Sequence, residues 1–264
     1  MTVAAAPAVG ELLRGWRERR RLTQLELALQ AEVSTRHLSF VETGRATPSR
    51  EMILHLAEQL DVPLRERNQL LLAGGYAPLY SQKGLDAREL TVVRDAIHNV
   101  VAAHEPNPAV VVDRHWNLVD ANSAVALFLE GVAPELRTPP VNVMRLSLHP
   151  RGVASRIINL VQWRAHLLGR LRREIAQTAD AELVELYTEV RGYQPHLEST
   201  LVESPGAGEV VVPLRFRADD QELVFFSMVA AFGTPLDITV EELALELFFP
   251  ANSSTADALR RRHA

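Results

Sequence analysis

Apolar residues recur at helical spacing through the first 75 residues, and capping residues interrupt them at short intervals. Leu12 and Leu13 lie four and three positions before Trp16, on one face of a first helix. Thr23 precedes Glu26 by three positions, the spacing of a capping box that begins a second helix. The pattern predicts five short helices, over about residues 12–21, 24–32, 35–43, 50–60 and 64–73.

The remainder of the chain mixes helical and strand periods. The segment "AVVVDRHWNLVDAN", residues 109–122, has two apolar runs around a tight turn, and Asn122 is placed to cap the helix that follows. Helices are also predicted over about residues 86–104, 153–178 and 181–190.

The end of the chain is rich in predicted strands. In "EVVVPLRFRA", residues 209–218, Leu214 and Phe216 alternate with arginines, as in a strand with one buried face. We also expect strands over 222–232 and, despite its helix-forming composition, over 241–250. Residues 91–264 therefore form an α+β domain with an antiparallel sheet of about five strands and helices on one face, after an all-α domain over 1–78 and a linker over 79–90.

Charge distinguishes the two parts. The net charge is −5, yet residues 14–50 contain eight Arg against four Glu. A local excess of arginine on a small helical domain is typical of a surface that binds nucleic acid. The whole chain contains 27 Arg and one Lys. Phosphate binding and the base composition of the genome explain this preference for arginine equally well.

The second and third predicted helices, separated by the turn "AEVS", form a helix-turn-helix, which places its second helix in the major groove of DNA. Arg36 can donate two hydrogen bonds to a guanine, and Phe40 can pack on a thymine methyl group. Gln24 is placed to contact a phosphate or to support another side chain. We expect contacts to double-stranded DNA from Thr23, Gln24, Ser34, Thr35, Arg36, His37, Ser39, Phe40 and Arg45. The alternative is a small helical bundle with a solvated polar face.

The stretch "LTQLELALQAEVSTRHLSFVETGRATPS" resembles the helix-turn-helix of the Cro/repressor-type (XRE) family over about residues 9–65. The resemblance implies a pair between Arg17 of the first helix and the inward Glu42 of the recognition helix. The family usually has Gly just before Val33, whereas this chain has Glu32, so we expect a strained turn with positive φ there.

The longer segment "VSTRHLSFVETGRATPSREMILHLAEQLDVPLRERNQLLLAGGYAP" is similar to the MmyB-like regulators, which join this motif to a PAS-like ligand-binding domain. The resemblance implies a small apolar ligand, a fatty acid, held between sheet and helices. We expect Arg145 and His149 to bind the carboxylate of this fatty acid. We expect its acyl chain to be lined by Leu160, Trp163, Leu167, Phe225, Met228, Phe232 and Leu247, near Met144. These apolar residues equally fit a packed core, and a ligand-free protein-interaction module is the alternative.

The sequence contains no motif for metal binding, cofactor binding or catalysis. Cysteine is absent, and none of the nine histidines forms an H-x-x-x-H or H-E-x-x-H pair, so we expect neither a metal site nor a cofactor. No nucleophile elbow, P-loop or dinucleotide motif is present, and we expect no enzymatic activity. Without a secretory signal or a long apolar run, the sequence indicates a cytoplasmic protein with no membrane span.

One short recognition helix contacts only a few base pairs, too few to select a site in a genome. We therefore expect a homodimer, in which two recognition helices lie about one DNA turn apart. The second domain should supply most of the interface, because the five N-terminal helices retain little apolar surface after packing.

Overall fold

The computed structural model describes residues 7–194 and 211–263, and the chain divides into two compact units. Unit 1 comprises residues 1–83 together with the segments 176–178 and 235–241, and unit 2 comprises the rest. Within the described ranges, no helix combines the length and apolar character that a membrane span requires.

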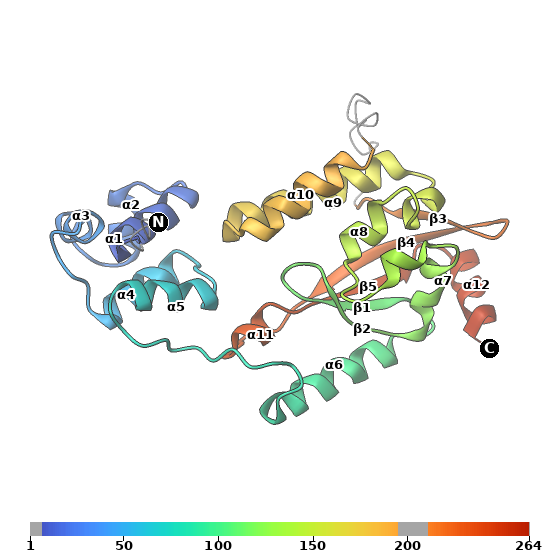
Figure 1. The fold of residues 1–264 in the computed structure, drawn as a ribbon, viewed down its shortest axis with the longest axis horizontal. Helices are drawn as coiled ribbons and strands as arrows, with labels where there is room; N and C mark the ends of the chain where they lie inside the picture. The colour runs from blue at the N-terminus through green and yellow to red at the C-terminus, as the bar shows by residue number, and fades with distance from the viewer. Residues whose placement is uncertain (1–6, 195–210, 264) are drawn as a thin grey trace. The chain divides into compact units, whose positions relative to one another are not determined.

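Unit 1 contains the five predicted short helices (Figure 1). Their apolar stripes meet in one core around Leu13, Leu27, Leu38, Ile53 and Leu70, all buried. A sixth short helix of this unit, α11, comes from the chain between two strands of unit 2. The helices are α1 (Val9–Arg19), α2 (Gln24–Gln30), α3 (Thr35–Glu42), α4 (Arg50–Gln59), α5 (Leu64–Ala73) and α11 (Ile238–Glu241).

The helix ends follow the capping residues of the sequence. Thr23 and Glu26 form the predicted capping box of α2, with the Glu26 carboxylate accepting from the Thr23 amide at 2.7 Å. Ser34 caps α3 by accepting from the His37 amide at 3.1 Å. Glu32 has the expected positive φ, 53°, in the turn between these helices. Local sequence therefore sets where each helix of the motif begins.

A buried ion pair joins the first helix to α3. Arg17 donates from Nε and Nη2 to the two carboxylate oxygens of Glu42, at 2.7 and 2.9 Å. The helices approach so closely that a Cβ on Gly10 of α1 would lie 2.2 Å from the Val41 carbonyl oxygen. The pair implied by the family resemblance is present, and glycine is required for the helix contact beside it.

Unit 2 is an α+β domain built on one five-stranded antiparallel sheet with the strand order β2-β1-β5-β4-β3. This agrees with the predicted fold class. The strands are β1 (Ala109–Val112), β2 (Leu118–Ala121), β3 (Leu214–Ala218), β4 (Gln221–Ala230) and β5 (Ala244–Pro250). The α-helices are α6 (Thr91–Ala103), α7 (Ala126–Leu129), α8 (Val143–Leu148), α9 (Leu160–Thr178), α10 (Ala181–Gly192) and α12 (Ser253–His263). Four 3₁₀ turns lie at Arg88–Leu90, Ser123–Val125, Pro134–Arg137 and Val153–Arg156.

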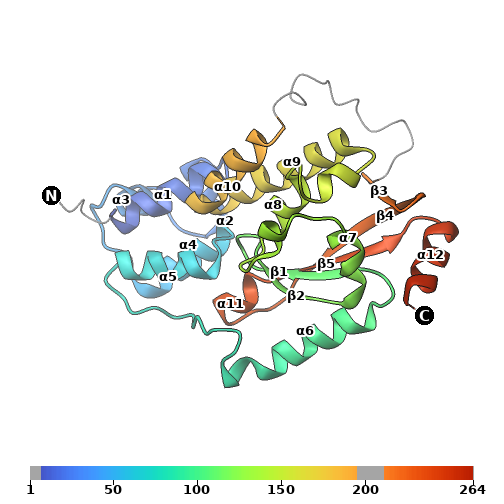
Figure 2. The same cartoon turned by 45° about the vertical axis from the view of Figure 1, so that its right-hand side comes forward.

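Both faces of this sheet are covered, whereas the sequence predicted helices on one face only (Figure 2). The larger core lies between one face and helices α7 to α10, with Val110 and Phe225 from the strands. On the opposite face, Ile97 and Val101 of α6 pack against Val111. The prediction missed the second layer because the alternating burial of Leu214 and Phe216 in β3 shows only one apolar face.

Two further details differ from the predictions. Asn122 does not cap a helix; its side chain accepts from the Ala109 amide at 3.1 Å and donates to the Val101 and Asn107 carbonyls at 3.1 and 2.8 Å. The predicted long helix over 153–178 is interrupted, because α9 begins only at Leu160. The first two residues of the predicted strand 209–218 lie outside the described residues.

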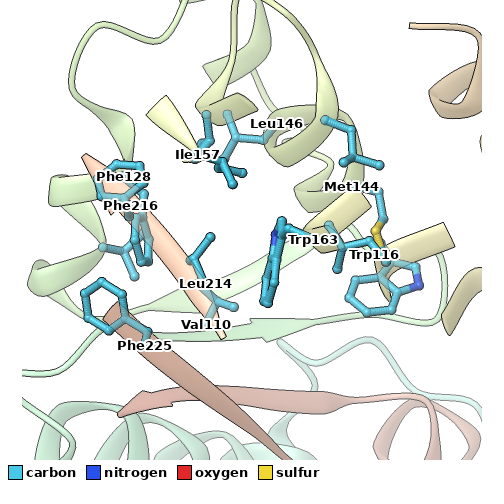
Figure 3. Close-up of a cluster of buried hydrophobic side chains, with 14 of the residues drawn as sticks. Val110, Trp116, Phe128, Met144, Leu146, Ile157, Trp163, Leu214, Phe216 and Phe225 are labelled. Carbon is cyan, nitrogen blue, oxygen red and sulfur yellow. The ribbon is translucent and has the colours of Figure 1, made fainter. Parts of the chain in front are cut away.

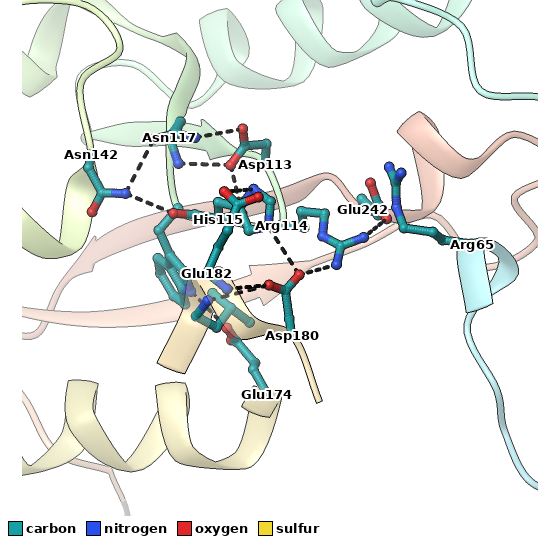
Figure 4. A network of polar contacts seen from close by, with 12 residues as sticks. Arg65, Asp113, Arg114, His115, Asn117, Asn142, Glu174, Asp180, Glu182 and Glu242 are labelled. Atoms are coloured by element: carbon teal, nitrogen blue, oxygen red, sulfur yellow. Dashed lines mark hydrogen bonds and ion pairs between the residues drawn. The ribbon is translucent and has the colours of Figure 1, made fainter. Parts of the chain in front are cut away.

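A polar network holds the β1–β2 turn in unit 2 (Figure 4). Arg114 bridges two carboxylates, pairing with Asp180 before α10 and with Glu242 before β5, the latter at 2.8 Å. The ring of His115 lies 3.0 Å from the same Asp180 carboxylate. Burial alone would raise the pKa of Asp180, but hydrogen bonds from Arg114 and His115 and the charge of Arg114 lower it to about 2.

The Arg17–Glu42 pair predicts a large effect on stability. Glu42→Ala leaves the Arg17 charge buried without its partner and should lower the free energy of unfolding of unit 1 by about 3–5 kcal/mol. Glu58→Ala, which removes an exposed carboxylate of α4 in the same unit, should cost less than about 1 kcal/mol. Urea unfolding of both variants measures the difference, and equal small losses would contradict the buried-pair assignment.

The Asp180 network predicts a defined pH dependence. Because the folded-state pKa is below the ordinary value, the charge of Asp180 stabilises unit 2 above about pH 4, and this contribution is lost as the pH falls toward 2. Asp180→Asn keeps a good helix cap but removes the charge, so its destabilisation should be largest at neutral pH and should shrink below pH 4.

Urea unfolding at several pH values measures this, with Trp116 and Trp163 as reporters in a Trp16→Phe background. Glu185→Gln is the control, because Glu185 lies on the same helix, α10, and is exposed. A pH-independent effect of Asp180→Asn would show that the charge is not involved.

Candidate DNA-reading helix and ligand-binding core

The orientation of α3 is set by its buried side. Leu38 and Val41 are each 1% exposed in the core of unit 1, and Glu42 is held by Arg17. The opposite side of the helix carries Arg36 and Phe40, one turn apart. The helix therefore cannot rotate to bury the residues that the sequence assigned to DNA without breaking the buried pair.

Phe40 lies between two arginines. The guanidinium of Arg36 is 5.3 Å from the centre of the Phe40 ring, and that of Arg45 is 6.0 Å from it. Arg45 follows Gly44, whose φ of 72° turns the chain after α3, and the Arg45 amide donates to the Phe40 carbonyl at 2.8 Å. The three side chains form a cationic surface with an aromatic centre, which we call the α3 surface. No pattern in the sequence indicates the contact between Arg45 and Phe40.

The predicted DNA residues do not all have free side chains. Gln24 donates to the Glu42 carboxylate at 2.8 Å, as the supporting role requires, and its contact with a phosphate stays a prediction. Thr23 and Ser34 use their hydroxyl oxygens as helix caps. Thr35, His37 and Ser39 lie on α3 and are partly exposed. Arg36, Phe40 and Arg45 are thus the residues best placed for a partner.

Four of the predicted ligand residues meet in the larger core of unit 2. Met144, Trp163, Leu167 and Phe225 are between 0% and 4% exposed, and Leu160 packs against their cluster (Figure 3). They come from α8, α9 and β4, so the core lies between helices and sheet as the family resemblance implies.

The same core contains three phenylalanines, Phe128, Phe216 and Phe248, that the sequence did not assign to ligand binding. Phe128 of α7 makes edge contacts with Phe216, Phe225 and Phe248, with ring centres 5.1, 5.7 and 5.3 Å apart. The inward alternation of Phe216 with Leu214 was a usable signal. Phe128 offered none, because its contacts depend on the packing of a short helix against three separate strands.

Three predicted ligand residues lie elsewhere, and this corrects the expectation that all of them line one cavity. Phe232 and Leu247 pack with α6 on the opposite face of the sheet. Met228, which pairs with Leu247 across β4 and β5, is 56% exposed. Side chains alternate between the faces of a strand, so these residues and Phe225 point away from each other across the sheet.

The predicted head-group residues belong to a surface network. Arg145 binds the Glu189 carboxylate through Nε and Nη2 at 2.7–2.9 Å, and the hydrogen bond to Glu189 raises the pKa of Arg145. The His149 ring contacts the edge of Tyr193, with ring centres 4.8 Å apart. Met144 faces the core while its neighbour Arg145 is 43% exposed along its side chain. A ligand carboxylate at Arg145 must therefore compete with Glu189.

No three His, Asp or Glu side chains of residues 7–194 and 211–263 lie close enough together to hold a metal ion. Two polar side chains beside this core are paired with each other: Arg170 donates to Glu246 at 2.9 Å, and it also stacks on Trp116, 4.5 Å from the ring centre. Trp116 in turn donates to Glu174 at 2.7 Å. Burial raises the pKa of Glu174, and the hydrogen bond from Trp116 opposes that rise.

Comparison with known families matches each unit separately. Residues 8–70 match a helix-turn-helix domain model, and residues 93–261 match the model of the MmyB-like transcription regulator ligand binding domain. No curated protein matches the chain. The second match covers more than half of the 264 residues. The chain belongs to the family of MmyB-like transcription regulators, with a helix-turn-helix domain followed by a ligand-binding domain.

Proposed function

We propose that this transcription regulator reads DNA as a homodimer through the α3 surface and that a long-chain fatty acid, bound in the larger core of unit 2, controls it. The observation that carries the proposal is the fixed presentation of Arg36, Phe40 and Arg45. A buried ion pair sets the rotation of α3, and the exposed side combines two cations with one aromatic ring.

The two arginines of the α3 surface have different roles in this proposal. Arg36 lies in the first turn of α3, the part of a recognition helix that reaches base edges. Arg45 lies beyond the end of the helix, where side chains more often contact phosphates and carry no sequence information. Phe40, between them, offers an apolar surface to a thymine methyl group.

The support for a fatty acid is the apolar character of the core and its place between helices and sheet. Met144, Trp163 and Leu167 present no charged group to it, which suits an acyl chain. Arg145 is the cation of α8, and it now binds Glu189. The ligand carboxylate would take the place of the Glu189 carboxylate in this ion pair. The methionine side chain adapts well to a chain of variable length.

One observation favours a second candidate, a ligand-free protein-interaction module. Phe128 already contacts three aromatic neighbours, and such close contacts are typical of a core filled by its own side chains. In that case unit 2 would bind a partner by its surface.

A dimer is proposed because of the small footprint of α3, which has eight residues. Two copies related by a two-fold axis double the number of base pairs read and match a palindromic site. Unit 2 contains more residues than unit 1 and is the proposed source of the interface.

The division of roles on the α3 surface predicts two kinds of loss. Arg36→Ala should weaken binding to the preferred DNA site by about 1–3 kcal/mol and relax the base preference at one position. Arg45→Ala should weaken binding to all sequences alike and reduce its dependence on salt. Binding isotherms on a selected site and on random DNA, at several salt concentrations, measure both effects. Equal losses of Arg36→Ala on the two DNAs would contradict its role as a base-reading residue.

The ligand and the dimer are tested together by native mass spectrometry of the full-length protein. The proposal predicts a dimer whose protomers each carry an added mass of a few hundred daltons, which organic solvent extracts as a fatty acid. Trp163→Ala should reduce this added mass, whereas Met228→Ala, on the other face of the sheet, should not. A monomer would contradict the dimer, and a protein free of added mass that also fails to take up palmitate would favour the interaction module.

A further inference from the structure

The connection between β4 and β5 belongs structurally to unit 1. Its residues Pro235–Glu241 pack with the helix-turn-helix domain, although the strands on either side belong to unit 2. Ile238 and Val240 of α11 are 2% and 6% exposed, whereas Leu236 is 81% exposed. α11 contacts α5, which agrees with its place in unit 1.

Hydrogen bonds fix this segment to the chain after α5. The Ile238 amide donates to the Ser81 carbonyl at 2.9 Å, and the Ser81 hydroxyl donates to the Asp237 carboxylate at 2.6 Å. The Thr239 hydroxyl donates to the Lys83 carbonyl at 2.6 Å. Ser81 and Asp237 also form a parallel β-bridge, so backbone and side chains are both engaged.

Glu241 supplies the N-terminal cap that α5 lacks in its own sequence. The residue before the helix is Pro63, which has no side-chain acceptor, and its position makes no capping hydrogen bond. The Glu241 carboxylate accepts from the Leu64 amide at 2.8 Å, 177 residues away along the chain. An anion at a helix N-terminus satisfies a free amide and interacts favourably with the helix dipole.

The next residue is anchored in the other unit. Glu242 accepts from Arg114, whose guanidinium also holds Asp180 at the start of α10. Two adjacent glutamates are thus fixed to different units, Glu241 to the first turn of α5 and Glu242 to the polar network of unit 2. One peptide link joins the two anchored residues.

We propose that the Glu241–Glu242 step, with α11, is the element through which unit 2 acts on the DNA-binding unit. This inference rests on the proposed function, because it names the route by which a ligand bound in unit 2 would alter the residues that contact DNA. A shift of β5 that moves Glu242 would pull on Glu241 and on the cap of α5. α5 packs on α1, and α1 carries Arg17, the partner of Glu42 in α3.

Hydrogen exchange of the full-length protein tests the step without a ligand. Ile238→Ala should accelerate exchange at the first-turn amides of α5, residues 64–67, several-fold, because it loosens α11. Arg114→Gln decides the proposal, since this substitution lies within unit 2 and removes the charged partner that holds Glu242. It should also accelerate exchange at 64–67. Leu236→Ala, which alters an exposed side chain of the same segment, is the control and should change nothing.

Unchanged exchange at residues 64–67 in Arg114→Gln, with unit 2 folded by its tryptophan fluorescence, would overturn the proposal. If Arg114→Gln does not fold, Asp180→Asn replaces it, because it weakens the same anchor and retains the α10 cap. The same outcomes then apply.

A second measurement connects the step to regulation. The affinity for DNA selected from a random pool is measured for lipid-stripped protein and after loading with palmitate. If palmitate changes the affinity of the wild type, Ile238→Ala should reduce that change toward none while it leaves palmitate uptake intact. A full palmitate effect in Ile238→Ala would overturn the proposal. No palmitate effect in the wild type would count against the proposed function, and the exchange result would still decide the coupling.

Discussion

The buried pair between Arg17 and Glu42 is the constraint on which the DNA-binding surface depends. Two charges removed from water are costly, and a well-packed apolar pair would often be at least as stable. The pair instead specifies geometry: both oxygens of Glu42 accept from Arg17, and one of them also accepts from Gln24. Three helices are thereby joined at one carboxylate. A small rotation of α3 would break all of these bonds, so its exposed side has one direction.

Much of unit 1 is predictable from sequence because local chemistry decides it. Thr23, Glu26 and Ser34 mark helix ends by hydrogen bonds that span three residues. The cap of α5 shows the limit of such inference. The sequence pattern predicts that α5 begins at Leu64, but nothing near Pro63 indicates which group caps it. The capping carboxylate comes from Glu241, a residue in the predicted strand 241–250. Sequence periodicity predicts elements and faces, but not which distant residue completes them.

The candidate ligand core illustrates a different limit. Alternation assigned Phe225 and Leu247 to strands correctly, and both are apolar. Alternation does not say which face of a strand is the ligand side when helices cover both faces. Leu247 packs under α6, and Phe225 packs with Phe128 on the other face. The sequence analysis therefore grouped residues from two separate cores, one on each face of the sheet, as candidates for a single ligand site.

The position of the two anchored glutamates gives any regulation by this route a thermodynamic condition. A ligand changes DNA affinity only by as much as its own affinity differs between two arrangements of the protein. Such a difference must arise in unit 2, near β5, because that strand leads directly from Glu242 into the core through Phe248. Coupling between two binding sites is reciprocal, so DNA must alter ligand affinity by the same factor. The covalent path between the two anchored residues is a single peptide link, so a displacement of Glu242 reaches the cap of α5 through the fewest rotatable bonds that a chain allows.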